Sequence, residues 1–368
     1  MKIFVIGARG FPGVQGGIES HCEELYPRLV RKGFEVTALT IKQYTETNNW
    51  KGISFIKVPS ASSKTFQKPI YNLISAIYCI LRRPDIIHVH GLNAGLFIWL
   101  FRLFGLKVVA TYHSMDYLYP KWNALVKAML RYSEKQFLSA DYIITVSKPY
   151  LKHFNERRRT QAISYLPNGV NLLDDGHEKN KNTILDGWGL QENGYILTVG
   201  RITPEKDILT LIKAFTKAKL SGIKLAIVGS AEFQEQYFEI LKRISNDNVI
   251  FTGQLNKNDL SVLYSNCRLF VLSSLYEGLP NALLEAMSFN CNILISDIDS
   301  HIAVGMEQDD YFKAQDIEDL ANKIDQKIPK NKKKDYSQFL LKNYNWDIVA
   351  DEVSKIYAET RKTYTSEV

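Results

Sequence analysis

Cysteine is scarce and scattered in this sequence of 368 residues. The four cysteines, Cys22, Cys79, Cys267 and Cys291, include no C-x-x-C pair. Disulfide frameworks and cysteine zinc sites both need paired or closely spaced cysteines, so the pattern argues against either kind of site. It favours a protein of a reducing compartment.

Long apolar runs are also missing. The most apolar stretch, residues 92–106, is too short for a membrane span and is interrupted by Asn93 and Arg102. It predicts a core helix between parallel strands. The N-terminus enters a predicted strand at once, without a charged segment followed by a long apolar core. We therefore expect no signal peptide and a cytoplasmic protein.

Acidic residues are few in the first half of the chain. Residues 1–170 hold 23 Lys and Arg against 10 Asp and Glu, a net charge of +13. The whole chain holds 46 Lys and Arg and 39 Asp and Glu, so residues 171–368 hold 23 basic and 29 acidic side chains, a net charge of −6. The basic half predicts an anionic partner, such as a lipid pyrophosphate or the inner face of an anionic membrane, with a solvated basic face as the alternative. No RNA-binding or helix-turn-helix pattern accompanies the charge, so we expect no nucleic-acid partner.

Predicted strands and helices alternate along a chain whose length suits two domains. Apolar runs predict strands of the first domain at 2–7, 35–40, 53–58, 85–91, 106–111 and 142–147. Similar runs predict strands of the second domain at 195–199, 223–229, 248–252, 268–272 and 292–296. This order predicts an α/β fold in which parallel sheets carry helices on both faces.

The stretch from Glu277 to Glu285 follows one of these predicted strands. Pro280 suits the first turn of a helix because its fixed φ is helical. Glu277 would then lie in the strand-to-helix loop, and Glu285 about one turn inside the helix. Backbone N–H groups at the start of such a helix attract phosphate. The alternative is a loop acid near a helix dipole and a solvated helix acid.

A second strand-to-helix turn begins at Gly200, after strand 195–199. Its sequence is Gly-Arg-Ile-Thr-Pro-Glu-Lys-Asp, so that Arg201 and Lys206 flank the turn. The planar fork of an arginine and the point charge of a lysine could neutralise a diphosphate together.

These two motifs, in this order, resemble those of the retaining glycosyltransferases of family 4, whose patterns are G-R-x-x-x-E-K-G and E-G-x₆-E. Asp207 stands where that family usually has glycine. The resemblance implies the GT-B fold, with two Rossmann-like domains whose parallel sheets face across a cleft. It also implies a nucleoside-diphosphate sugar as the donor, no metal and no cofactor. The segment Asp297-Ile298-Asp299 is accordingly not predicted to bind a metal.

The resemblance also places the domain boundaries. Residues 167–171 resemble the family's P-N-G-V-D, with Asn171 in place of the acid. We expect an N-terminal acceptor-side domain at 1–170 and a C-terminal nucleotide-sugar domain at 171–345. A final helix, 346–368, is expected to cross back to the first domain.

A glycine-rich loop, residues 7–17, follows the first strand. Its first three glycines are spaced G-x-x-G-x-x-G rather than G-x-G-x-x-G, which disfavours a nicotinamide oxidoreductase. A merely permissive turn is a further alternative. The resembling family has such a loop, ending in a Gly-Gly pair and an acid that match Gly16, Gly17 and Glu19. The whole pattern looks most like bacterial rhamnosyltransferases of surface-polysaccharide synthesis.

Histidines lie at the predicted carboxyl ends of two strands, where open α/β sheets bind ligands. His90 ends one strand, and His88, on the same side of it, is expected to be a buried structural residue. His113 ends another strand beside Asp116, and such a pair could bind hydroxyls or orient an imidazole. A strand-end cap is the alternative for His113, whereas the resemblance assigns it to the donor sugar. We assign His90, Asp116 and Glu19 to the acceptor side.

The resemblance further implies that Glu277 lies near the donor sugar and that Glu285 holds the ribose hydroxyls. Glu277, His113, Arg201 and Lys206 are the expected catalytic residues. The donor is expected to contact these cations and Glu285 together with Gly16, Gly17, Gly200, Gly253, Leu255, Gly278, Leu279 and Asn281.

The predicted activity is a retaining, metal-independent hexosyl or rhamnosyl transfer. The acceptor would be a lipid-linked saccharide or an oligosaccharide in O-antigen, capsule or exopolysaccharide synthesis. A GT-B-fold nucleotide-sugar epimerase and a non-catalytic nucleotide-sugar-binding protein remain alternatives.

Overall fold

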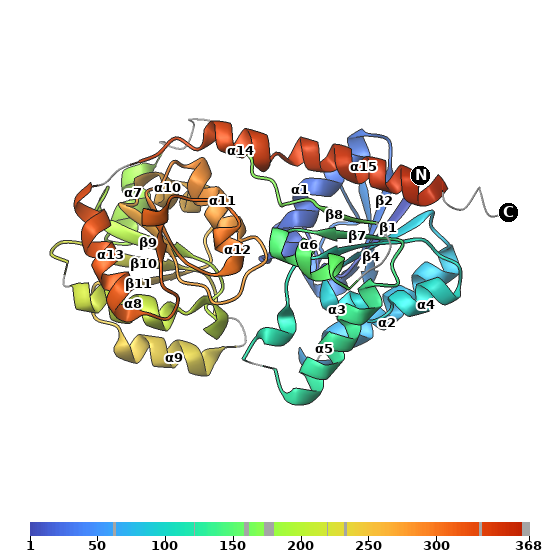
Figure 1. Ribbon diagram of the computed structural model, residues 1–368, viewed down its shortest axis with the longest axis horizontal. Helices are drawn as coiled ribbons and strands as arrows, with labels where there is room; N and C mark the ends of the chain where they lie inside the picture. Colours follow the sequence, from blue (N-terminus) through green and yellow to red (C-terminus); the bar gives the residue numbers. More distant parts are fainter. Residues whose placement is uncertain are drawn as a thin grey trace. The chain divides into compact units, whose positions relative to one another are not determined.

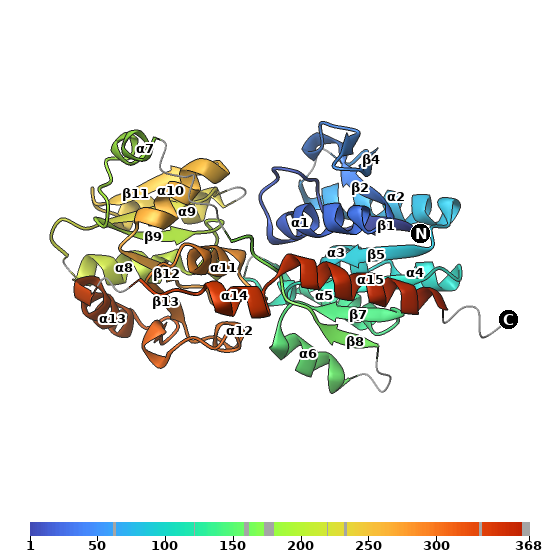
Figure 2. The ribbon, with the colours of Figure 1, turned by 90° about the horizontal axis from the view of Figure 1, so that it is seen from above.

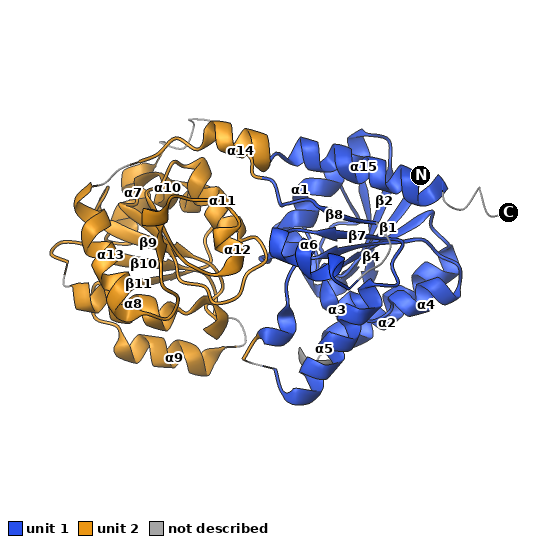
Figure 3. Cartoon of the chain, viewed as in Figure 1, with its two compact units in different colours: residues 1–118, 122–169, 345–368 blue, residues 119–121, 170–344 orange. Residues whose placement is uncertain are grey.

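The chain divides into two compact units (Figure 3). Unit 1 comprises residues 1–118, 122–169 and 345–368, and unit 2 comprises residues 119–121 and 170–344. The computed structural model describes residues 1–61, 64–120, 122–157, 162–172, 180–218, 220–231, 234–330 and 333–362. The last residues of the predicted C-terminal helix, 363–368, lie outside the described residues.

Unit 1 is built on an eight-stranded sheet with the order β3-β4-β2-β1-β5-β6-β7-β8. Only the short β3 runs antiparallel to its neighbour; every other pairing is parallel. The strands are β1 (Lys2–Ile6), β2 (Glu35–Ile41), β3 (Asn49–Trp50), β4 (Ile53–Val58), β5 (Ile86–His90), β6 (Val108–Tyr112), β7 (Tyr142–Thr145) and β8 (Ile163–Tyr165).

Helices cover both faces of this sheet (Figures 1 and 2). The α-helices are α1 (Gly17–Arg31), α2 (Lys64–Arg82), α3 (Gly91–Gly95), α4 (Ile98–Leu103), α5 (Ala124–Phe137), α6 (Lys148–Asn155) and α15 (Trp346–Lys362), and the short 3₁₀ turns are η1 (Lys42–Tyr44) and η2 (Asp116–Leu118). Ile3 and Val5 of β1 pack with α1 and α15, while Ile6 packs with α2, α4 and α5 on the opposite face. Alternation along the strand thus supplies two apolar layers.

Unit 2 carries a six-stranded sheet with the order β11-β10-β9-β12-β13-β14, parallel throughout. Its strands are β9 (Tyr195–Val199), β10 (Lys224–Val228), β11 (Val249–Gly253), β12 (Leu269–Leu272), β13 (Ile293–Ser296) and β14 (Tyr311–Phe312). Its helices are α7 (Lys181–Gly187), η4 (Pro204–Lys206), α8 (Ile208–Ala218), α9 (Glu235–Ile244), α10 (Lys257–Asn266), α11 (Asn281–Ser288), α12 (Asp299–Ile302), η5 (Gln308–Asp310), α13 (Ile317–Lys330) and α14 (Ser337–Asn343). The prediction of two parallel-sheet α/β domains is confirmed.

Two local predictions were wrong. The apolar stretch 92–106 forms the two short helices α3 and α4 rather than one core helix, and Trp99 and Leu103 are exposed. Gly95 ends α3 where it packs against Phe137, so closely that an added Cβ would lie 2.3 Å from the ring. Pro280 caps α11 in an extended conformation instead of occupying its first turn.

No helix within the described residues is both long enough and apolar enough to span a membrane.

Candidate functional site

The carboxyl ends of the unit 2 strands gather the predicted donor-binding residues. Gly200 follows β9, Gly253 ends β11, and Glu277 lies in the loop after β12. The loops that leave these strands are tied together, because the Gly229 N–H donates to the Gly253 carbonyl and the Gly200 N–H to the Val228 carbonyl, both at 2.9 Å. Ligands of open parallel sheets bind at this edge.

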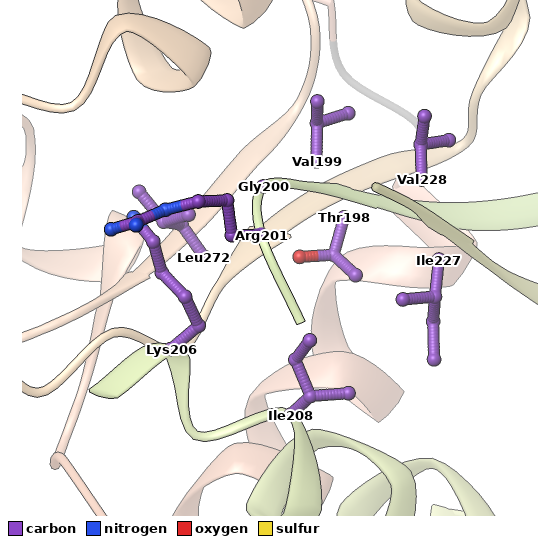
Figure 4. A pocket seen from close by; sticks show the side chains of 9 residues that line it. All are labelled: Thr198, Val199, Gly200, Arg201, Lys206, Ile208, Ile227, Val228 and Leu272. Atoms are coloured by element: carbon purple, nitrogen blue, oxygen red, sulfur yellow. The ribbon is translucent and has the colours of Figure 1, made fainter. Parts of the chain in front are cut away.

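The turn after β9 brings two cations to this edge. A small pocket there is lined by the ends of β9, β10 and β12 together with Arg201 and Lys206 (Figure 4). The Lys206 side chain passes over Gly200, where an added Cβ would lie 3.6 Å from the Cε of the lysine. Arg201 keeps 43% of its side chain exposed and lies 3.8 Å from the carboxylate of Glu205. The guanidinium is therefore available to an anionic ligand.

Lys206 forms an ion pair with Glu277, a residue 71 positions further along the chain. The Ser274 hydroxyl also donates to the Glu277 carboxylate, at 2.8 Å. Burial alone would raise the pKa of Glu277, but the charge and hydrogen bond of Lys206 outweigh it and lower that pKa. Glu277 is thus held as a carboxylate beside a lysine, and the ammonium group retains two further N–H donors for a ligand.

His301 lies near this ion pair and was missed by the sequence reasoning. It is fully buried in α12, and its Nδ1 lies 2.9 Å from the Ser296 carbonyl. Burial lowers the pKa of His301 to about 4, although the charge of Glu277 acts in the opposite direction. The available signal was its position just after β13, next to the Asp297-Ile298-Asp299 segment. In that segment, Asp297 accepts a hydrogen bond from the Ala314 N–H.

Glu285 lies on α11, where the Tyr264 hydroxyl donates to its carboxylate at 2.9 Å. Burial raises the pKa of Glu285, and the Tyr264 hydrogen bond opposes that change. The remaining predicted donor residues of unit 2 lie at the same edge. Leu255 lies between β11 and α10, and the others, Gly278, Leu279 and Asn281, lie at or just before the start of α11.

In unit 1, the glycine-rich loop closes on the start of α1. Gly16 caps this helix with a φ of 155°, and an added Cβ would lie 1.9 Å from a carboxylate oxygen of Glu19. Gly17 is the first helical residue. Glu19 is buried and accepts hydrogen bonds from the backbone N–H and the Nε of Arg9, at 3.1 and 3.0 Å. The structure thus gives Glu19 a role in shaping the loop.

A chain of hydrogen bonds runs through the buried histidines of unit 1. His88 Nε2 lies 2.7 Å from Thr111 Oγ1, and its Nδ1 lies 3.0 Å from the Tyr26 hydroxyl. Tyr26 also bonds His90 Nε2, and His90 Nδ1 lies 3.0 Å from His113 Nε2. The prediction that His88 is buried and shares a side with His90 is confirmed, since their ring centroids are 4.2 Å apart.

The histidine chain determines what the predicted acceptor-side residues contact. His90 is 1% exposed, and both its ring nitrogens have partners inside unit 1. It is therefore more deeply buried than His113, which is 9% exposed. Asp116 accepts a hydrogen bond from the Ser114 hydroxyl. The observed partner of the His113 ring is therefore His90, and the prediction that Asp116 orients this imidazole finds no contact in the described structure.

His21, His90 and His113 present imidazole nitrogens within 4.8 Å of one another, the spacing of a group that could hold a metal. None of the three was predicted as a metal ligand. His90 and His113 bond each other, and His21 Nδ1 lies 2.8 Å from the Asn168 side-chain oxygen. A hydrogen bond therefore accounts for the proximity of His90 and His113, whereas His21 packs against both rings, at centroid distances of 5.3 and 5.0 Å. Burial lowers the pKa of His21 to about 4, which keeps this ring neutral.

Two family models match the chain, one in each half. The model described as Glycosyltransferase Family 4 matches residues 15–173, and the model described as Glycosyl transferases group 1 matches residues 180–339. The chain belongs to glycosyltransferase family 4. The predicted family and its GT-B fold are confirmed.

Relatives of this glycosyltransferase span most of its length. An uncharacterised glycosyltransferase of Methanocaldococcus jannaschii is 24% identical over 97% of this chain and 98% of its own. A UDP-Gal:α-D-GlcNAc-diphosphoundecaprenol α-1,3-galactosyltransferase of Escherichia coli is 25% identical over 79% of this chain and 80% of its own. Sucrose-phosphate synthase of Thermosynechococcus elongatus has the same fold, with a TM-score of 0.80, 19% identity and full coverage of both chains.

Proposed function

We propose that this glycosyltransferase moves a sugar from a nucleoside diphosphate to a lipid-linked saccharide, with retention at the anomeric carbon, in O-antigen, capsule or exopolysaccharide synthesis. The observation that carries the proposal is the Lys206–Glu277 ion pair beside Arg201, at the carboxyl edge of the unit 2 sheet. The Escherichia coli relative, whose name gives a UDP-sugar donor and a diphosphoundecaprenol acceptor, supports the substrate class.

The proposed chemistry follows from where charge develops. The bond between the anomeric carbon and the phosphate oxygen breaks, and the leaving diphosphate gains negative charge. Arg201, Lys206 and the N–H groups preceding α11 stabilise that charge, so no metal is required. Glu277 and His113 act at the donor sugar. The acceptor oxygen bonds the anomeric carbon on the same face, and its proton passes to the departing phosphate oxygen.

A thermal-shift panel of nucleotide sugars tests the donor assignment. A ligand at about a hundred times its dissociation constant adds roughly 2.7 kcal/mol of stability, which should raise the Tm of a domain of this size by roughly 5 °C or more. We expect one nucleotide sugar to give this shift, and to give it equally in EDTA. No shift with any member, or a shift with NADH alone, would contradict the proposal. Sugar interconversion without an acceptor would identify an epimerase instead.

The proposed role of Glu285 predicts an effect on donor binding rather than on chemistry. Glu285→Ala removes a carboxylate that would accept hydrogen bonds from the ribose hydroxyls, and a charged hydrogen bond is worth about 1.5–3 kcal/mol. The KM for the donor should therefore rise roughly 10- to 100-fold with kcat nearly unchanged. Steady-state kinetics with varied donor measure this. The control is Glu318→Ala, which removes an exposed acid paired with Lys217. A lower kcat with an unchanged KM would assign Glu285 to the chemical step.

A further inference from the structure

Helix α2 exposes an apolar face to solvent. Ile70, Leu73, Ile77 and Leu81 recur at helical spacing and are 38%, 45%, 48% and 75% exposed. Residues separated by three or four positions lie on one side of a helix. Buried residues such as Tyr71 and Cys79 hold the opposite side against the unit 1 core. A soluble surface seldom keeps four large aliphatic side chains in one row.

Helix α4 extends this face. Figures 1 and 2 show α4 beside α2, and the two helices are in contact. Trp99 and Leu103 of α4 and Phe104, which follows it, are 46%, 71% and 44% exposed. Arg83, just after α2, donates to the Phe104 carbonyl at 3.3 Å, so the C-terminal ends of the two helices meet. We call these seven apolar residues of α2 and α4 the α2/α4 face.

The charge around the α2/α4 face is positive. Residues 64–107 contain six Lys and Arg but a single acid, Asp85. Asp85 is already bonded to the Lys2 N–H, at 2.7 Å, and lies 3.5 Å from Arg361. Arg82 lies over the Tyr78 ring, and neither Arg82 nor Arg83 forms an ion pair within the described part of the chain. Arg102 is balanced by Asp141. The apolar row therefore ends beside two unneutralised arginines.

We propose that the α2/α4 face seats unit 1 on an anionic lipid bilayer. Apolar side chains would enter the boundary between head groups and acyl chains while Arg82 and Arg83 meet lipid phosphates. The pattern fits a bilayer better than a protein groove, because aliphatic and aromatic side chains combined with cations, and with acids that are already paired, complement an anionic apolar interface. Such a contact would give the enzyme access to a lipid-linked acceptor. Only this benefit of membrane binding rests on the proposed function.

Vesicle co-sedimentation of the full chain tests this surface. Vesicles of phosphatidylcholine with phosphatidylglycerol are compared with vesicles of phosphatidylcholine alone, at low and high salt. We expect binding to the anionic vesicles at low salt and weaker binding in the other conditions. The Leu73→Ser/Ile77→Ser variant should lose about tenfold in partitioning, since each tenfold change requires only about 1.4 kcal/mol. The single variant Leu81→Ser, at a still more exposed position, should show a smaller loss.

The matched control is Ile240→Ser/Leu341→Ser, which removes two unit 2 side chains exposed to the same degree, 48% and 49%. It should bind vesicles like the unaltered protein. Equal binding by all variants would overturn the proposal, as would absence of binding to anionic vesicles. Conversion from dimer to monomer by Leu73→Ser/Ile77→Ser, without vesicle binding, would also overturn it by assigning the face to a second copy. The thermal shift with nucleotide sugars should be unchanged in these variants, which separates failure here from failure of the proposed function.

Discussion

Lys206→Ala should lower kcat/KM for sugar transfer by roughly 10²–10³-fold, the usual effect of removing one preorganised donor from a developing oxyanion. Lys206 is the cation that the structure holds against Glu277 at the edge of the unit 2 sheet. Without it, the leaving diphosphate keeps only Arg201 and the N–H groups that precede α11. Burial would then raise the pKa of Glu277 without the opposing charge of Lys206. A smaller fraction of this residue would be ionised at the donor sugar. Steady-state kinetics with a nucleotide sugar and a lipid-linked acceptor measure the loss.

The matched control is Lys217→Ala. Lys217 is an exposed lysine of α8 paired with Glu318, and exposed ion pairs contribute little to stability. This variant should transfer sugar at the normal rate, and both variants should keep a folded unit 2 in circular dichroism. Turnover by Lys206→Ala within about a factor of three of the normal rate would remove the proposed diphosphate site, because one donor of such a site is worth roughly a hundredfold or more.

Unit 1 should unfold on mild acidification before unit 2 does. Burial lowers the pKa of four of its histidines, His21, His88, His90 and His113, and neighbouring histidines lower three of them further. A histidine whose pKa is depressed in the folded state binds a proton more readily when unfolded. Its stabilising effect is therefore complete above pH about 6.5 and is lost as the pH falls from there towards 4.

The size of the effect follows from proton counting. Each histidine that is neutral when folded and protonated when unfolded lowers the free energy of unfolding by about 1.4 kcal/mol for each pH unit of acidification. The four together lower it by roughly 5 kcal/mol per pH unit. Whole domains are stable by about 5–15 kcal/mol. Hydrogen exchange at several pH values, corrected for intrinsic rates, should show β5 and β6 losing protection before β9 and β12.

An internal comparison and one variant check this assignment. In the described residues of unit 2, His301 is the only histidine. His21→Asn should reduce the pH slope of unit 1 by about a quarter, although it also lowers stability at neutral pH by disturbing a buried site. Earlier loss of protection in unit 2, or an unchanged slope in the variant, would show that other groups control the acid response.

Local sequence patterns predicted most of the elements. The run Tyr-Ile-Leu-Thr-Val, in which only the threonine is not apolar, defined β9, and the observed bounds of this strand are the predicted ones. Lys206 and Glu277 could be singled out although 71 positions separate them, because each belongs to a turn with recognisable chemistry. The division of 92–106 into two helices was not predictable in this way, because it depends on the packing of Gly95 against Phe137, a contact between distant residues.

The buried histidines of unit 1 also show that local patterns do not reveal contacts between residues distant in the sequence. His88 Nδ1 lies 2.5 Å from the hydroxyl of Tyr357, a residue 269 positions away. No periodicity or spacing links such residues, since the contact exists only once the sheet and two covering helices are assembled. Sequence reasoning placed His90 and His113 at strand ends, with His88 buried on the side of His90. It could not find His21, Tyr26 or Tyr357 around them.

Helix α15 has a consequence for how the protein is made. It follows both sheets along the chain, yet Trp346, Val349, Val353 and Tyr357 complete one apolar layer of the unit whose first strand begins at Lys2. While the ribosome is still synthesising residues 170–344, one face of the emerging N-terminal sheet has α1 but still lacks α15. Unit 2 has all its own segments before α15 is made, so it can mature first, and the earlier-translated half must wait, within reach of chaperones, until α15 has been synthesised.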